Sequence, residues 1–131
     1  MIEKNKLNDA VICKEDDSAF DVSRIMRDTQ NRHIIVVDNE LKPLGIISTF
    51  DINNRVVAEE IDPKSIKAKD IMTFPIDSVE ISESYEGAYG KMVKKGTYTI
   101  PVTENGKLIG ILDFNLIFKK ICEIEKKGGE K

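Results

Sequence analysis

The sequence predicts a mixed α/β fold (α+β) made of two similar units, and two observations support this prediction. The chain contains an internal repeat: residues 25–36 have a counterpart in residues 91–102, and residues 44–47 recur in residues 109–112. Each copy alternates stretches of helical periodicity with short β-branched runs. A unit of about sixty residues buries too little surface to be stable alone, so we expect the two units to pack sheet to sheet and to leave clefts along their seam.

The first copy begins with a helix. Residues 16–18 are polar and offer an N-cap, and the apolar side chains that follow recur at helical spacing: Ala19, Val22, Ile25 and Met26. A β-branched strand is expected at residues 34–37, a turn at 38–40 and a second strand through 45–47. A closing helix then carries four more apolar residues: Phe50, Ile52, Val56 and Val57.

The second copy predicts the same elements in the same order. Residues 82–84 offer the N-cap, and the helix that follows carries Tyr85, Ala88, Tyr89, Met92 and Val93. A strand at residues 99–103, a tight turn at 104–107 and a strand through 110–112 form a predicted hairpin. The closing helix carries Phe114, Leu116, Ile117, Phe118 and Ile121.

Composition argues against several classes of function. The chain has 20 Lys and Arg against 23 Asp and Glu, a net charge of −3, and this balance disfavours a nucleic-acid partner. Its apolar runs are far shorter than the ~20 residues that a membrane span needs. The first residues lack the apolar core of a secretion signal, so we expect a cytoplasmic protein.

The sequence also offers little for metal binding or catalysis. Cys13 and Cys122 lie far apart and His33 is the single histidine, so neither a zinc ribbon nor a disulfide scaffold is indicated. The chain lacks a GxxxxGK[ST] phosphate loop, and its serines and cysteines have no recognisable nucleophile context. We therefore expect no metal and no enzymatic activity.

Three short motifs carry a resemblance to a known family. Residues 70–73 read Asp-Ile-Met-Thr, residues 92–102 fit M-x-x-x-G-x-x-x-h-P-V, where h is apolar, and residues 45–51 fit G-h-h-[ST]-x-x-D. These motifs follow one another in order and occur nearly complete in both copies, and together they resemble a tandem pair of CBS domains, the Bateman module. Repeat 1 departs from the family pattern at two places: residues 8–11 match the opening motif poorly, and Ile35 stands where repeat 2 has Pro101.

The resemblance implies a fold, an assembly and a class of function. It implies α-β-α-β-β-α in each repeat, with pseudo-twofold symmetry between repeat 1 (residues 1–62) and repeat 2 (63–127), and we expect a solvated tail at 128–131. It also implies a homodimer. The function it implies is non-catalytic: the module requires no cofactor, binds an adenine nucleotide as a regulatory ligand, and modulates an unknown protein target in trans.

The local sequence pattern by itself indicates two candidate ligand-binding residues, Ser48 and Asp51. A helix is expected to begin at about Thr49, where first-turn amides and the helix dipole favour a phosphate, and Asp51 could accept hydrogen bonds from both hydroxyls of a ribose. The same Ser-x-x-Asp pattern also resembles a capping box, which is a purely structural role. The other copy has Asp113 and Leu116 at these positions, so Asp113 can still cap a helix there but the ribose-binding carboxylate is absent. With the resemblance, this comparison predicts one competent cleft per chain, organised by repeat 1.

The remaining site residues are implied by the resemblance. Arg32 would be a permanent cation for a phosphate, and His33 would be a donor sensitive to pH near neutrality. The adenine would lie against the opposite repeat, lined by Met72, Thr73 and Ile76, with main-chain groups near Thr97 and Tyr98 reading its edge. The structural alternatives are that His33 is an ordinary strand-edge residue and that Tyr98 belongs to the core or to the dimer surface.

The ligand and the function leave alternatives open. Phosphate contacts favour AMP, ADP or ATP, whereas S-adenosylmethionine needs no anion contact and would leave Arg32 unexplained. A ligand-free dimeric interaction module is the other interpretation, in which Ser48 and Asp51 are only a helix cap. The closing helices, around residues 56–57 and around residues 118 and 121, are the candidate dimer surface.

Overall fold

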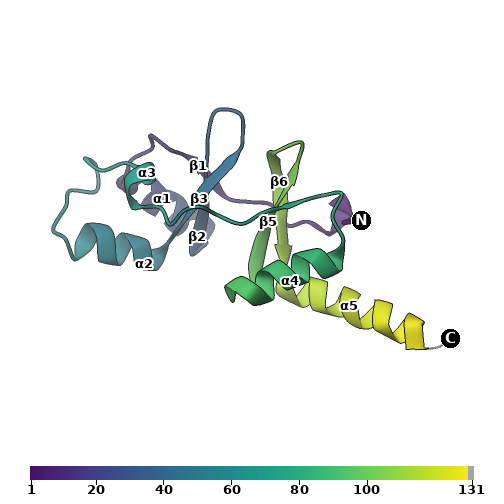
Figure 1. Cartoon of the computed structure of the whole chain (residues 1–131). Helices are drawn as coiled ribbons and strands as arrows, with labels where there is room; N and C mark the ends of the chain where they lie inside the picture. Colours follow the sequence, from purple (N-terminus) through teal and green to yellow (C-terminus); the bar gives the residue numbers. More distant parts are fainter. Residues whose placement is uncertain (130–131) are drawn as a thin grey trace. The chain divides into compact units, whose positions relative to one another are not determined.

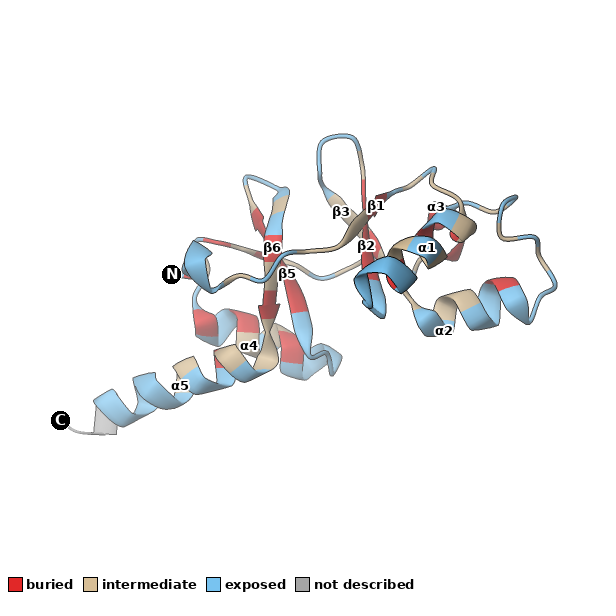
Figure 2. Cartoon of the chain, turned by 180° about the vertical axis from the view of Figure 1, so that it is seen from behind, coloured by how far each residue is buried: buried red, intermediate tan, exposed pale blue. Residues whose placement is uncertain are grey.

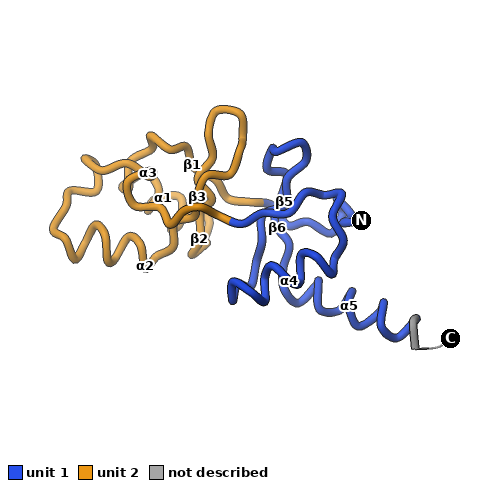
Figure 3. Tube along the Cα trace, in the orientation of Figure 1, with its two compact units in different colours: residues 1–9, 77–131 blue, residues 10–76 orange. Residues whose placement is uncertain are grey.

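A computed structural model of the chain describes residues 1–129 and the side chains through Lys127. The described chain forms two compact units (Figure 3), of which unit 1 comprises residues 1–9 and the chain from residue 77 onward, and unit 2 comprises residues 10–76. Of the predicted tail, residues 128–129 end the last helix, and residues 130–131 lie outside the described residues.

Unit 2 contains the first three-stranded sheet, in the order β1-β2-β3 (Figure 1). Strand β1 runs parallel to β2, and β2 runs antiparallel to β3, with His33 paired to Ser48 at the end of the hairpin. The elements are, in chain order, β1 (Ile12–Lys14), α1 (Ala19–Thr29), β2 (His33–Val37), β3 (Pro43–Ser48), α2 (Thr49–Ile52), a wider π-type turn η2 (Asn53–Val57) and α3 (Ala68–Ile71).

Unit 1 contains the second sheet, in the order β4-β5-β6, with the same pairing directions. Helices α4 and α5 lie together beside β5 and β6 (Figure 1). Its elements are a 3-10 turn η1 (Lys4–Lys6), β4 (Val79–Glu80), α4 (Tyr85–Lys95), β5 (Thr99–Glu104), β6 (Lys107–Asp113) and α5 (Phe114–Gly129). The mixed α+β class and the two hairpins predicted from the repeat are confirmed.

Local signals set the starts of α1 and α4 as the sequence predicts. Helix α1 begins at Ser18, whose side chain accepts a hydrogen bond of 3.0 Å from the amide of Asp21. Helix α4 begins at Ser84, whose side chain accepts one of 3.0 Å from the amide of Gly87. Helix α4 ends at Gly96, which adopts a φ of 67° that suits glycine.

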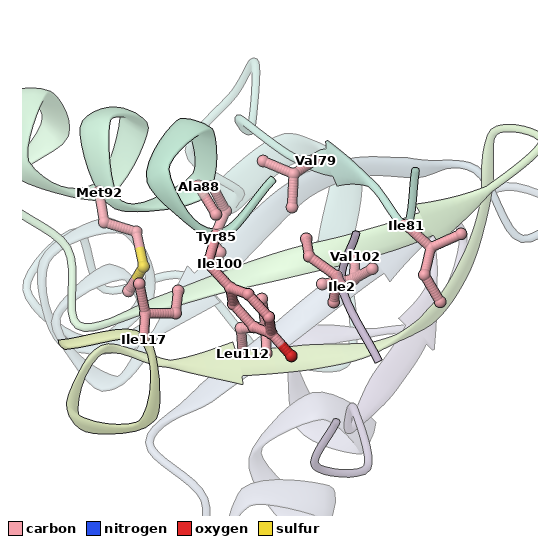
Figure 4. Packing of buried hydrophobic residues seen from close by; sticks show 10 residues of the cluster. All are labelled: Ile2, Val79, Ile81, Tyr85, Ala88, Met92, Ile100, Val102, Leu112 and Ile117. Carbon is pink, nitrogen blue, oxygen red and sulfur yellow. The ribbon is translucent and has the colours of Figure 1, made fainter. Parts of the chain in front are cut away.

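Each unit has its own hydrophobic core, and Figure 2 colours the buried residues of the chain red. In unit 1 the core is formed by β4, β5 and β6 together with α4, α5 and the chain near Ile2 (Figure 4). In unit 2 it is formed by Cys13, Ala19, Val22, Met26, Ile34, Val36, Ile47, Val56, Ala68 and Ile71. Most of the periodic apolar residues of both copies therefore supply the two cores, as their spacing predicts, whereas Phe50, Val57, Val93 and Phe118 are exposed.

Unit 2 includes a segment that crosses its second hairpin strand. The amide of Ile46 donates to the carbonyl of Thr73 at 3.0 Å, and the amide of Thr73 donates back at 2.8 Å. A Cβ atom on Gly45 would lie 2.7 Å from the sulfur of Met72 and 2.8 Å from the carbonyl oxygen of Thr73. Glycine is therefore required at position 45 because the crossing segment occupies the space of a side chain.

Unit 1 repeats this crossing with the start of the chain. Asn8 and Ile111 exchange two backbone hydrogen bonds of 2.9 Å, and a Cβ on Gly110 would lie 2.9 Å from the carbonyl oxygen of Asn8. Asn8 thus occupies the place that Thr73 has in unit 2, so residues 8–11 are not the counterpart of the Asp-Ile-Met-Thr motif, contrary to the prediction from the short motifs. Unit 1 therefore includes residues 1–9 from the start of repeat 1, and unit 2 includes residues 63–76 from the start of repeat 2. The division of the two sequence repeats after residue 62 stays a prediction.

Candidate functional site

The junction between β3 and α2 forms a complete capping box. The amide of Asp51 donates to Oγ of Ser48 at 3.3 Å, and the amide of Ser48 donates to Oδ2 of Asp51 at 2.8 Å. The Ser48 hydroxyl also lies 3.2 Å from the same carboxylate oxygen. The structural role predicted for the Ser-x-x-Asp pattern is therefore present, and the carboxylate is fixed in orientation by the turn that carries it.

The second oxygen of Asp51 faces the crossing segment. The Thr73 hydroxyl donates to Oδ1 at 3.3 Å, and Nε of Arg55 lies 3.9 Å from the same atom. The Asp51 side chain is 13% exposed, so this oxygen lies at a partly covered edge and not in free solvent. A group that approaches it must compete with the Thr73 hydroxyl or share the oxygen with it.

Arg55 is a residue of this cluster that the sequence reasoning missed. Its Nη1 atom donates to the carbonyl of Ile71 at 2.9 Å and to the carbonyl of Met72 at 3.0 Å. The one signal that could have found it is its spacing of four residues from Asp51, which places two opposite charges on neighbouring turns. The contacts with residues 71 and 72 depend on the tertiary fold and leave no local signal.

Arg32 and His33 lie at the same end of the hairpin as Ser48. The carbonyl of Arg32 accepts a hydrogen bond of 3.1 Å from the amide of Thr49, and His33 is paired with Ser48 across the strands. Both side chains are exposed, so both are accessible to a ligand at this end. The amides of Thr49 and Asp51 are already bonded within the chain, which leaves Arg32 as the stronger candidate for a phosphate contact.

The predicted adenine wall is divided between the two units. Met72, Thr73 and Ile76 belong to unit 2, where Met72 is half-buried over Gly45. Thr97 and Tyr98 belong to unit 1. The Tyr98 side chain is 81% exposed, so it is not a core residue.

The equivalent junction in unit 1, between β6 and α5, has a helix cap but no carboxylate at the position of Asp51. The amide of Asn115 donates to Oδ1 of Asp113 at 2.7 Å, so Asp113 caps α5 as the sequence predicts. Leu116 stands where Asp51 stands in unit 2, and it packs against the core of unit 1. The Tyr98 carbonyl accepts from the amide of Phe114 at 2.8 Å, just as the Arg32 carbonyl accepts from Thr49.

Metal ligands and membrane-spanning helices are both absent from the described part of the chain. Within residues 1–129, three or more His, Cys, Asp or Glu side chains nowhere gather in a way that could hold a metal ion. Nor does any helix in this range have the length and apolar character needed to cross a membrane.

Comparison with known proteins gives one family and several relatives. The family model described as "CBS domain" matches residues 6–58 and again residues 68–123. An uncharacterized protein of Methanopyrus kandleri is 31% identical over 105 residues, which is 79% of this chain and 54% of that protein. The CBS domain-containing protein CBSCBSPB2 of Arabidopsis thaliana is 31% identical over 127 residues, which is 95% of this chain and 24% of that protein.

A solved structure extends the likeness to the fold. A hexameric CBS-CP12 protein from bloom-forming cyanobacteria has a TM-score of 0.71 and 24% identity, over 96% of this chain and 74% of that chain. The present chain spans 54% of the Methanopyrus relative and 24% of the Arabidopsis relative. The likeness therefore concerns the paired domain and not the whole of those longer proteins.

Proposed function

The chain belongs to the CBS-domain family, and from this premise we propose that it is a non-catalytic regulatory module that binds an adenine nucleotide (AMP, ADP or ATP) at the Ser48–Asp51 junction. Tandem CBS modules are generally regulatory and often bind nucleotides. The observation that carries the proposal is the placement of Asp51, whose carboxylate is oriented by the capping box while its Oδ1 atom faces Thr73 at a partly covered edge.

The chemistry of this edge supports a ribose and a phosphate. A fixed carboxylate accepts two hydroxyl donors at once, and a ribose diol offers such a pair. Arg32 is exposed at the same end of the hairpin and carries a permanent charge that suits a phosphate. Leu116 replaces the carboxylate in unit 1, which supports one nucleotide per chain.

Calorimetric titration with AMP, ADP, ATP and S-adenosylmethionine tests the proposal. We expect binding of one AMP, ADP or ATP per chain, and its loss in Asp51→Asn, which keeps the size of the side chain but removes its charge. Asp28→Asn is the matched control, because Asp28 is an exposed aspartate of unit 2 that pairs with Arg27 at 2.9 Å. Two nucleotides per chain would contradict the single-site prediction and assign binding to the Asp113/Leu116 junction as well.

The alternative is a ligand-free interaction module, and one observation favours it. The Asp51 carboxylate already accepts hydrogen bonds from Ser48 and Thr73 inside the chain, as a purely structural cap would. If none of the four ligands gives heat or shifts the melting temperature, this alternative replaces the nucleotide sensor. S-adenosylmethionine binding without nucleotide binding would leave Arg32 without a role.

We also propose that the module is a homodimer that acts on a protein target in trans. The related CBS-CP12 protein is hexameric. Val57 is 64% exposed and Phe118 is 49% exposed, so both closing helices offer apolar surface, whereas Val56 is buried in the core of unit 2 and cannot contribute as expected. Light scattering on the wild type and on Phe118→Ser would test the dimer: we expect twice the chain mass, reduced in the variant.

A further inference from the structure

We infer that Arg55 is the positioning residue of the proposed ribose site, because it holds the Asp51 carboxylate and the Thr73 hydroxyl in register. The inference rests on the proposed function and adds a residue and a specificity to it. Arg55 would not contact the nucleotide. It would determine how well the site distinguishes a ribose diol from a sugar that lacks one.

Arg55 first acts on the end of α3. The last carbonyl groups of a helix have no partner within the helix and are stabilised by side-chain donors. The guanidinium group of Arg55 supplies such donors to Ile71 and Met72, at 2.9 and 3.0 Å. This contact fixes the backbone immediately before Thr73.

Arg55 also acts on the carboxylate. Oδ1 of Asp51 lies between Nε of Arg55, at 3.9 Å, and the Thr73 hydroxyl, at 3.3 Å. The distance of 3.9 Å between Arg55 and Asp51 fits an ion pair but is too long for a hydrogen bond. Arg55 therefore acts on Asp51 through its charge, and on the segment that carries Thr73 through hydrogen bonds. Together with the two backbone hydrogen bonds between Ile46 and Thr73, the Arg55 side chain therefore helps to set the separation of the Asp51 carboxylate and the Thr73 hydroxyl, which lie twenty-two residues apart.

A ribose diol would depend on this arrangement. Oδ2 of Asp51 is bonded to the amide of Ser48 at 2.8 Å, so an incoming diol would approach through Oδ1 and take the place of the Thr73 hydroxyl. With Arg55 in place, Oδ1 keeps its position when that exchange occurs. Without Arg55, Oδ1 loses its neighbouring positive charge and the crossing segment loses two of the hydrogen bonds that hold it, so the cost appears only for ligands that use the diol.

Unit 1 provides an internal comparison for this cluster. Lys120 stands at the position of Arg55, six residues after the first residue of the helix, and it pairs with Glu3 at 3.6 Å and with Glu123 at 3.9 Å. A lysine carries its three donors on one nitrogen, so it lacks the planar group with which Arg55 donates to two carbonyls through Nη1 while Nε faces Asp51. The arginine therefore accompanies the copy that has the carboxylate.

The test is a comparison of two nucleotides in four proteins. AMP and 2′,3′-dideoxy-AMP are titrated into the wild type, Arg55→Ala, Arg55→Gln and the control Arg27→Ala, an exposed arginine of α1 in the same unit. We expect the wild type to prefer AMP, and we expect this preference to fall about tenfold in both Arg55 variants, the size of one hydrogen bond to a charged group. Arg27→Ala should keep the full preference.

The outcomes separate the inference from the proposed function. A merely structural role would weaken both nucleotides equally in the Arg55 variants and leave the preference unchanged, which overturns the inference and leaves the proposed function intact. Failure of the wild type to bind AMP would overturn both.

Discussion

Replacing Gly45 with alanine is expected to destabilise unit 2 strongly. The added Cβ would lie 2.7 Å from the sulfur of Met72, 2.9 Å from its Cγ and 2.8 Å from the carbonyl oxygen of Thr73. That carbonyl cannot retreat without weakening its 3.0 Å hydrogen bond from the amide of Ile46. We expect a loss of about 2 kcal/mol in the free energy of unfolding, the middle of the range for overpacked sites.

The assay is equilibrium unfolding in urea, followed by circular dichroism. At a slope of about 2 kcal/mol per molar, the expected loss lowers the unfolding midpoint by about 1 M. Gly90→Ala is the control: Gly90 lies in α4, where an added Cβ would meet nothing within 4 Å, so we expect a gain of about 0.5–1 kcal/mol. If Gly45→Ala unfolded at the same urea concentration as the wild type, the close crossing of the Thr73 segment would be refuted.

Three further predictions concern stability, pH and reactivity. Ser48→Ala should reduce the free energy of unfolding by about 1 kcal/mol through loss of the cap, and an unchanged urea midpoint would contradict the capping box. Hydrogen bonds from the Thr103 hydroxyl, and from the amides of Asn105 and Gly106, hold the pKa of Glu80 below its ordinary value of 4.5. Because the folded pKa is the lower one, this contribution is present above pH 4.5 and is lost as the pH falls through the folded value, so Glu80→Gln should show a shallower loss of stability in acid than the wild type. Burial, and to a lesser extent the charge of Asp17, raises the pKa of the Cys13 thiol to about 12, so a maleimide at about pH 8 should label the exposed Cys122 in the folded protein and spare Cys13 until urea is added.

The family and much of the local structure follow from the sequence by itself. The caps at Ser18, Ser84 and Asp113 lie within three residues of the amides that they bond, so local patterns predict them correctly. The capping box at Ser48 and Asp51 is predicted for the same reason. The apolar spacing of the helices and the β-branched runs of the strands likewise depend on neighbours along the chain.

The environment of the candidate site was decided by tertiary structure. Thr73 and the carbonyl of Met72 reach Asp51 and Arg55 because the segment after α3 returns to cross β3, and the sequence offers no local pattern for that return. The same crossing made Asn8 the counterpart of Thr73, where comparison of short motifs placed it wrongly. Hydrogen bonds between residues far apart form only when packing has brought their segments together, so their partners can be read from the folded chain and not from residue spacing.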